Sequence, residues 1–482
     1  MLARIIHKEI LPALIIAAAL LLGLLIWQIW LVLAIVISAA AGYSIYRLKL
    51  FNQAYFLLAF ALPLSVEMPL FKGVNMLFPS EPLAVSILIA LGINALQTNA
   101  FKKTTKLLIP SFALISALAF TTLLSTNVGV SVKYTLIYSL YIVCFYWGIY
   151  AVYNKSKLWL NSIMSGYTFS YLLVIAWAVY KWSWYAFNPV VVPAIFEPFY
   201  ADHTIFSAAG VFLSIYWLGC MIKAKDFKKR LLNLMILIAV LVGLRIANSR
   251  AALLSLPVGL IVGYFVYRGF SKRHLAIVAF STICVLLYSK NSIYEWISYN
   301  QYDSRDEHAS FVERTASVGN VQTDVSNLER INRWAAALNM GSRKPLYGFG
   351  PGTFQFEYIP FQDERWMNRL SVVDIHDIPQ NSGGTVHSEP LLFLSESGIV
   401  GLLSWILLII TWLWWVLSVK KGKRSIYLAI ATAMVSTYLF HGFFNNFLNT
   451  DKLAFLFWGA AAVMMIEVKN ENPNKYILQL GR

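Results

Sequence analysis

The fold is decided by the stretch PLLFLSESGIVGLLSWILLIITWLWWVL, which runs from Pro390 to Leu417 and contains a single charged side chain, Glu396. A bilayer core about 30 Å thick requires about 20 apolar residues in a helix, so this stretch is predicted to span a membrane. The basic segment 420–424 follows directly, and basic residues collect on the cytoplasmic side of spanning helices. The preceding end of the span, at His387, is therefore expected to face outward.

The composition of the whole chain agrees with this prediction. Of 482 residues, 59% are hydrophobic and 13% are charged, and the mean hydropathy is +0.63. A soluble protein has about half apolar and about a quarter charged residues, so a soluble class is excluded. The net charge of +16 is attributed to membrane topology, and no nucleic-acid partner is expected. Cys144, Cys220 and Cys284 lie in apolar runs, which predicts buried thiols without a disulfide framework or zinc spacing.

Similar apolar windows predict an all-α polytopic membrane protein of about 12 to 14 transmembrane helices. An N-terminal transmembrane bundle of about 11 helices occupies 1–289, a large and mostly helical outer domain occupies 290–388, and about three further helices occupy 389–482. Near the N-terminus, no small-residue cleavage site follows a short apolar core, and the apolar run continues. We therefore do not expect a cleaved signal peptide. The predicted windows are 10–27, 28–46, 54–72, 82–98, 107–125, 132–153, 158–182, 204–222, 231–247, 251–267, 273–289, 390–417, 425–444 and 452–467.

Charge predicts the topology. With the N-terminus in the cytoplasm, the inside segments carry 24 basic and four acidic residues. The outer segment 290–388 carries nine basic and 12 acidic residues. We therefore predict that both termini are cytoplasmic and that the outer domain lies on the other side of the membrane.

Two arginines lie on the outer side, where this charge rule disfavours them. Arg245 and Arg250 flank a short connection between two predicted spans, so at least one lies near the edge of the hydrocarbon region. One interpretation is that the side chains extend to lipid headgroups. The other is that they form a fork for a phosphate or pyrophosphate, and the sequence favours a functional role for Arg250.

A helix is predicted in the outer segment, from a capping box at Ser326 to the glycine at position 341. An apolar repeat at helical spacing consists of Leu328, Ile331, Ala335 and Leu338. Another side of the helix carries Arg330, Arg333, Trp334 and Ala337. This second side is either a solvated face with the tryptophan at the membrane surface or a second cationic arm above the site.

His387 is the candidate general base. Pro390 suits the first turn of a helix, which places His387 or Ser388 at the cap, on the outer membrane surface. Histidine accepts a proton readily near neutral pH. The alternative is a capping or interfacial histidine. Glu389 either favours the helix dipole or orients the imidazole.

Other polar residues recur at the outer ends of the predicted spans. They are Glu67, Glu81, Asp202, His203, His441, Asn445, Asn446 and Asp451. The glycine-rich segment 345–352, Pro-Leu-Tyr-Gly-Phe-Gly-Pro-Gly, lacks the Lys and Ser/Thr of a P-loop and predicts a tight turn. The sequence contains no Asp-x-Asp pair and no His/Glu zinc helix, so we expect no metal ion and no cofactor. Charges are rare at mid-span positions, which disfavours an ion-coupled transporter.

Three segments resemble the O-antigen ligase and polymerase superfamily of bacterial membrane glycosyltransferases. They are Ser249-Arg250 at the start of a span, Arg330-Ile-Asn-Arg-Trp334 followed by Pro345-Leu-Tyr-Gly-Phe-Gly350, and His387-Ser-Glu-Pro-Leu-Leu-Phe-Leu-Ser-Glu-Ser-Gly-Ile-Val-Gly401. Their order, their spacing and the large outer loop fit the superfamily over residues 245–405, and the resemblance to an O-antigen ligase is greatest. The chain departs from the pattern at Ser388, where many members have Asn, and in its larger number of predicted spans.

The resemblance implies a C-type, inverting glycosyltransferase fold in the bacterial inner membrane, with an active site that faces the periplasm. The implied partners are a glycan donor on undecaprenyl pyrophosphate, a lipid A–core acceptor and the surrounding membrane lipids. Arg250 and Arg330 would hold the pyrophosphate, and His387 would activate the acceptor hydroxyl. The further candidates for substrate binding are Arg245, Arg333, Glu389, His203 and Trp334.

Two other functions remain open on the sequence. A polysaccharide polymerase or a protein O-oligosaccharyltransferase shares the mechanism and differs in its acceptor. A transporter of lipid-linked glycans belongs to another class. The outer segment of about 100 residues and the histidine at its return to the membrane disfavour this last function.

Overall fold

The computed structural model describes residues 29–71, 74–98, 106–153, 159–269, 325–363 and 384–471. Within these ranges the protein is almost entirely helical, and eight helices are long and apolar enough to span a membrane. The prediction of an all-α polytopic membrane protein is therefore confirmed. The predicted spans 10–27 and 273–289 lie outside the described residues, as does Cys284.

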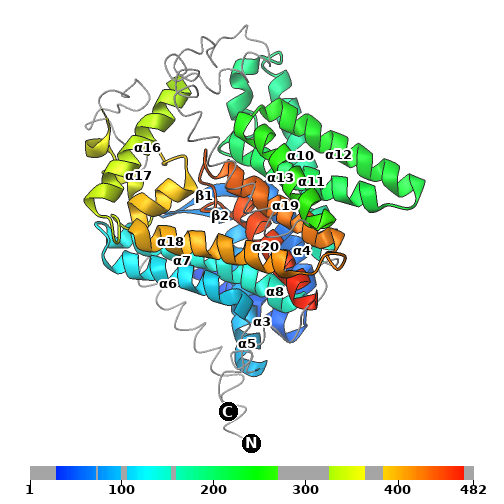
Figure 1. Cartoon of the computed structure of the whole chain (residues 1–482), viewed down its shortest axis with the longest axis horizontal. Coiled ribbons are helices and arrows are strands. Elements are labelled where there is room, and N and C mark those ends of the chain that lie inside the picture. Colours follow the sequence, from blue (N-terminus) through cyan, green and yellow to red (C-terminus); the bar gives the residue numbers. More distant parts are fainter. Residues whose placement is uncertain are drawn as a thin grey trace, which may run out of the picture.

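The described helices follow the predicted windows closely. The long apolar helices are α5 (Ser80–Thr98), α6 (Ile109–Leu123), α7 (Val128–Tyr141, continued by η5 and α8 to Val152), α10 (Met164–Ser183, preceded by η6 from Trp159), α11 (His203–Lys223), α12 (Phe227–Ala247), α13 (Arg250–Arg268) and α18 (Glu389–Ser418). The remaining helices of the bundle are α3 (Ile29–Arg47), α4 (Phe51–Ala61), α19 (Ile426–His441) and α20 (Asp451–Glu471). The outer segment contributes α16 (Val325–Arg343) and α17 (Phe354–Glu357), which lie beside one end of α18 and away from α12 (Figure 1).

The predicted span 54–72 is wrong at its second half. Helix α4 ends at Ala61 and a 3-10 turn follows, because Pro63 supplies no backbone N–H for a continuing helix. The chain then forms an antiparallel hairpin of β1 (Val66–Phe71) and β2 (Val74–Phe78). The side-chain amide of Asn75 donates a hydrogen bond to the Glu67 carboxylate at 2.7 Å across this hairpin.

One end of the bundle gathers the first residues of α5, α11, α13, α18 and α20, and we call it the hairpin end. A buried pair at the start of α20 ties it together. Asp451 accepts a hydrogen bond from the Ser80 hydroxyl at the start of α5. The Lys452 ammonium donates to the carbonyl of Ser65, beside β1, at 2.7 Å and to that of Phe199, before α11, at 2.6 Å. These bonds fix the ends of four elements relative to one another.

The opposite end of the bundle carries the basic residues that follow α18. Arg424 is buried there and donates to the carbonyls of Leu417 at 3.1 Å, Val419 at 3.0 Å and Val266 at 3.2 Å. The carbonyls of Val266 and Leu417 belong to the last turns of α13 and α18, where helices leave acceptors unsatisfied, and Val419 caps α18. One guanidinium group therefore closes both helices.

Helix α13 packs against α19 through small residues. A Cβ atom at Gly259 would lie 2.3 Å from Cγ2 of Thr437, and one at Gly263 would lie 2.9 Å from Cβ of Ala433. Small residues four positions apart let two helix backbones approach closely in a membrane. The two helices run in opposite directions, so the first turn of α13 lies beside His441, the last residue of α19.

Helix α18 is interrupted at Gly398, whose φ of 61° and ψ of −160° are open essentially to glycine alone. The outer segment fills the break. The N–H of Ile399 donates to the carbonyl of Pro345 at 2.7 Å, and the N–H of Gly350 donates to the carbonyl of Glu396 at 2.7 Å. The backbone groups that the broken helix releases are thus satisfied by the chain 345–352, which we call the latch loop.

The buried Glu396 side chain strengthens this connection. Its carboxylate accepts hydrogen bonds from the backbone N–H groups of Gly352 at 2.7 Å and Phe354 at 3.0 Å. A Cβ atom at Gly348 would lie 2.4 Å from the carbonyl carbon of Glu396, so the two backbones touch. The segment for which the sequence predicted a tight turn therefore joins the outer domain to a spanning helix.

The buried side of α16 differs from the predicted apolar repeat. Leu338 of that repeat is 50% exposed, whereas Asn332, Ala337 and Met340 are fully buried. Asn332 is satisfied by hydrogen bonds with the Gln362 side chain at 2.8 Å and with the N–H of Asp363 at 3.0 Å. The apolar repeat was a wrong guide because the helix packs on α18 and on the chain after the latch loop through its small and polar side. The helix also begins at Val325, one residue before the predicted cap.

Candidate active site

Side chains from four separate segments converge at the hairpin end. Arg330 of α16 acts electrostatically on three histidines: His203 at the start of α11, His387 before α18 and His441 at the end of α19. Asp202, which caps α11, acts on the same three histidines with its negative charge, opposite to the positive charge of Arg330. We call these five residues the histidine cluster.

The backbone of His387 is held on both sides. Its φ of 57° lies in the left-handed region, which residues other than glycine and asparagine rarely adopt. Its N–H donates to Oδ1 of Asn446 at 3.0 Å, and its carbonyl accepts the indole N–H of Trp334 at 3.3 Å. The next residue, Ser388, is the N-cap of α18. Contacts from Asn446 and from Trp334 of α16 therefore fix the backbone position from which the His387 imidazole extends.

The imidazole of His387 is neutral at pH 7. Burial, together with the positive charges of Arg330 and Arg333, lowers the pKa of His387 to about 4. Its Nδ1 atom is buried and has no hydrogen-bond partner within the described part of the chain. A neutral imidazole with an unsatisfied ring nitrogen is able to form a hydrogen bond with a substrate hydroxyl.

The two arginines that break the charge rule occupy different environments. Arg250 is the first residue of α13 and is half-buried, and the backbone of the next residue, Ala251, contacts the His441 imidazole. Arg245 lies in the last turn of α12 with an exposed side chain. The short turn therefore brings the start of α13 to the histidine cluster and leaves Arg245 on the surface of α12.

The neighbouring arginines of α16 also differ. Arg333 is buried, pairs with Glu329 at 2.8 Å and donates to the carbonyl of Thr385 at 2.9 Å. Its guanidinium carbon lies 5.4 Å from the ring centre of Tyr358. These contacts direct Arg333 to the segment that precedes His387.

Glu389 is buried and connects α18 to the chain after α19. Its carboxylate accepts hydrogen bonds from the Tyr438 hydroxyl and from the N–H of Leu448 at 3.1 Å. Its own N–H donates to the carbonyl of Gly442 at 2.7 Å. The Glu389 carboxylate thus points into the core of the bundle. His387, two residues earlier in the chain, lies in the histidine cluster.

His203 belongs to the cap of α11. The Asp202 carboxylate accepts from the N–H and the hydroxyl of Thr204, both at 2.7 Å, and lies 3.4 Å from Nδ1 of His203.

Within the ranges that the structure describes, no three His, Cys, Asp or Glu side chains lie close enough together to hold a metal ion.

Comparison with known protein families covers the segments that carry most of these residues. Residues 234–406 match the family model described as O-antigen ligase. No curated protein matches the chain significantly. This family match supports a glycosyltransferase activity of the O-antigen ligase or polymerase type.

The O-antigen ligase match includes α13, α16, the latch loop and the start of α18. It excludes His203 of α11, His441 of α19 and Asn446, which all contact or act on residues within the match. The candidate site is therefore assembled from the matched range and from helices on both sides of it.

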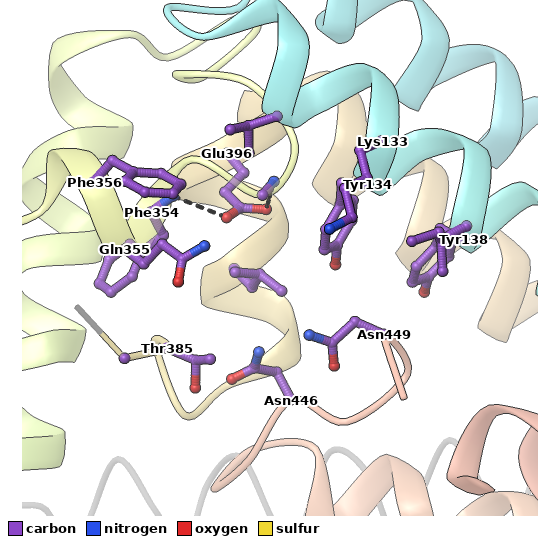
Figure 2. A pocket seen from close by; sticks show the side chains of 15 residues that line it. Lys133, Tyr134, Tyr138, Phe354, Gln355, Phe356, Thr385, Glu396, Asn446 and Asn449 are labelled. Carbon is purple, nitrogen blue, oxygen red and sulfur yellow. Dashed lines mark hydrogen bonds between the residues drawn. The ribbon is translucent and has the colours of Figure 1, made fainter. Parts of the chain in front are cut away.

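A cavity of about 350 Å³ lies beside the His387 segment, and most of its lining residues were not predicted from the sequence (Figure 2). Figure 2 shows Gln355, Asn446 and Asn449 around the same space as Tyr134 and Tyr138 of α7. The other lining residues include Lys133, Phe356, Thr385, Leu392 and Glu396. One sequence feature could have indicated this cavity. Lys133 is a basic residue near the predicted outer start of a span, as Arg250 is.

Proposed function

We propose that the protein is an O-antigen ligase, which transfers a glycan from undecaprenyl pyrophosphate to lipid A–core at the periplasmic face of the bacterial inner membrane. One juxtaposition carries the proposal: the neutral imidazole of His387 lies in the field of Arg330, at the end of the bundle where Arg250 begins α13. A base next to fixed cations is the arrangement that transfer from a diphosphate leaving group requires.

In the proposed reaction, His387 accepts the proton of the acceptor sugar hydroxyl as its oxygen attacks C1 of the donor sugar. The bond between C1 and the pyrophosphate oxygen breaks on the opposite face, so the configuration at C1 inverts. The electron pair leaves with the pyrophosphate, whose growing charge is stabilised by Arg250 and Arg330. Bidentate hydrogen bonds from guanidinium groups to phosphate oxygens suit this role, and the reaction balances without ATP or a metal ion.

A second cavity supports a lipid substrate. It has a volume of about 290 Å³, lies between α18 and α19, and begins at Glu389 and Gly442 next to the His387 segment. Its walls are mostly apolar and consist of Pro390, Trp405, Ile406, Ile409, Ile410, Tyr438, Leu439 and Phe443. Several of these side chains are exposed on the outside of the bundle, among them Ile410 at 55%. We assign this groove to a prenyl chain whose pyrophosphate reaches the histidine cluster.

The other predicted site residues receive supporting roles in this proposal. Trp334 and Arg333 position the His387 segment through its carbonyl groups. Glu389 fixes the start of α18, and His203 borders Arg330. Arg245, exposed on α12, is assigned to lipid headgroups at the approach to the site.

The proposal is tested on lipopolysaccharide gels from a deletion strain complemented with variants. His387→Ala, Arg250→Lys and Arg330→Lys should each abolish the polymer ladder, because lysine does not reproduce a bidentate fork. Arg343→Lys is the matched control, since Arg343 is exposed at the far end of α16 and should leave the ladder intact. An intact ladder with His387→Ala would refute the assignment of the base.

The deletion strain also identifies the acceptor. Loss of a ligase leaves long lipid-linked polymer that is not joined to the core. Loss of a polymerase leaves single repeats on the core, and loss of a protein transferase leaves unglycosylated protein. Transfer by purified protein in detergent, where no gradient exists, separates all three enzymes from a transporter.

A further inference from the structure

A third cavity, of about 450 Å³, lies under the β-hairpin and adjoins the cavity of Figure 2. The two cavities share Lys133 and Ile137 of α7 and Gln355 of the chain after the latch loop. They therefore form one trough, which runs from Glu396 across α7 to Glu67 and Asn75 of the hairpin.

The trough runs along the histidine cluster. At one end it includes Thr385 and Asn446, and the Asn446 side chain holds the N–H of His387 at 3.0 Å. At the other end it includes Ala201, which precedes Asp202 of the cluster. The trough thus borders the residues that adjoin His387 and Asp202, next to the position at which we place the reaction.

The chemistry of the walls suits sugars. Side-chain amides of Gln355, Asn446 and Asn449 each offer a donor pair and an acceptor, which is what adjacent hydroxyl groups require. Tyr134 and the 37% exposed Phe356 supply aromatic surface at the same place. Pockets of this kind combine apolar walls with a few polar groups that fix orientation.

The charge of the trough separates it from a pyrophosphate site. Lys133 lines both cavities and lies within electrostatic range of Glu81, and Lys452 lines the cavity under the hairpin beside Asp451. Glu67 lines the same end, and Glu396 lines the other. Four carboxyl side chains against two lysines disfavour a polyanion and leave hydrogen bonding to neutral hydroxyls as the dominant interaction.

We propose that this trough is a glycan subsite, in which Gln355, Asn449 and Lys133 bind the hydroxyl groups of a neutral sugar chain beside the reacting centre. The inference rests on the proposed function and adds the sugar-binding residues to it. The sugar chain belongs either to the donor or to the acceptor, and both present the same chemistry to these side chains.

Binding measurements on the full-length protein in lipid nanodiscs test the proposal. The probes are undecaprenyl pyrophosphate without sugars, the polysaccharide released from the native donor, and the delipidated core oligosaccharide. Gln355→Ala and Asn449→Ala should weaken binding of one of the two glycans by about tenfold, as expected for lost hydrogen bonds, and leave the bare lipid pyrophosphate unaffected. The glycan that is weakened identifies the source. Gln53→Ala is the control, because Gln53 is exposed at the start of α4.

Two results would overturn the subsite. One is unchanged affinity for both glycans together with unchanged KM values for transfer in Gln355→Ala and Asn449→Ala. The other is weaker binding of the bare lipid pyrophosphate, which would make the trough part of the pyrophosphate site. Arg330→Lys tests the proposed function separately, since it should weaken the bare lipid pyrophosphate. A failure there leaves the glycan result intact.

Discussion

The backbone at His387 makes it possible to separate folding from chemistry at a single residue. Its φ of 57° favours asparagine over alanine, because the asparagine side chain tolerates the left-handed region. We predict that His387→Asn and His387→Ala both abolish transfer, and that the alanine variant is less stable by about 1 kcal/mol. Thermal unfolding in detergent measures this difference. Equal stability of the two variants, or transfer by the asparagine variant, would contradict the prediction.

The depressed pKa of His387 predicts a pH profile. A pKa of about 4 keeps the imidazole neutral from pH 7 down to about pH 5, so kcat/KM should change little across that range. An unperturbed histidine would lose half of its activity near pH 6.5. Since Arg330 contributes to the lowering, Arg330→Gln should raise the pKa of His387, which an NMR titration of the imidazole would show even though transfer is lost. An acid limb near pH 6.5 in the parent protein would exclude His387 as the base described here.

The same shift has a consequence for stability. Because the pKa is lower in the folded state than in the unfolded state, the unfolded chain binds more protons between pH 6.5 and about pH 4. The contribution of His387 to stability is complete above pH 6.5 and is lost as the pH falls to about 4. His387→Asn should therefore reduce the loss of melting temperature between pH 7 and pH 5.

At the scale of elements, the break in α18 is one of the contacts that join the outer domain to the membrane bundle. A Cβ atom at position 398 would lie 2.4 Å from the carbonyl carbon of Leu346, at a φ and ψ that only glycine adopts readily. Gly398→Ala should therefore destabilise the protein by about 2–3 kcal/mol and expose the latch loop to proteolysis. Gly92→Ala in α5 is the matched control, since no atom lies within 4 Å of its added Cβ. Limited proteolysis with equal rates for the two variants would show that the break does not hold the domain.

At the scale of the whole molecule, the charge pattern predicts which end of the bundle faces outward. Ser342→Cys on the exposed side of α16 should react with a membrane-impermeant maleimide in spheroplasts. Lys421→Cys, which is exposed at the opposite end, should react only after the membrane is permeabilised. Both cysteine variants are made in a protein in which Cys144, Cys220 and Cys284 are replaced by alanine, so that only the introduced thiol reacts. The reverse labelling pattern would overturn the topology.

Much of the bundle is predictable from the sequence because burial in lipid is a local property of an apolar window. The window 82–98 thus falls within two residues of α5. The features that sequence reasoning missed depend on contacts between distant segments. The stretch around Gly398 is as apolar as an unbroken helix, and its break is stable only because the latch loop, far away in the sequence, supplies hydrogen bonds. The buried Asn332 likewise depends on Gln362.

The candidate site likewise contains some residues that are recognisable in the sequence and others that only the fold identifies. Arg250 and His387 are recognisable in the sequence because a charged or polar residue at the end of an apolar span needs an explanation. The direction of a side chain is not encoded in this signal, and so the inward-facing Glu389 carboxylate and the pairing of Arg333 with Glu329 required the fold. The residues of the trough, such as Gln355 and Asn449, have no local signature at all.

The broken helix also sets an order for biogenesis. The latch loop leaves the ribosome before α18, yet its backbone donors and acceptors find their partners in that helix. In the predicted topology, the outer domain consequently crosses the membrane before the element that locks it has been made. Its last folding step must wait until the translocation machinery has released α18 into the bilayer. Maturation of the outer domain is therefore coupled to the insertion of a later segment, and a protease added during synthesis would find the latch loop unprotected until that moment.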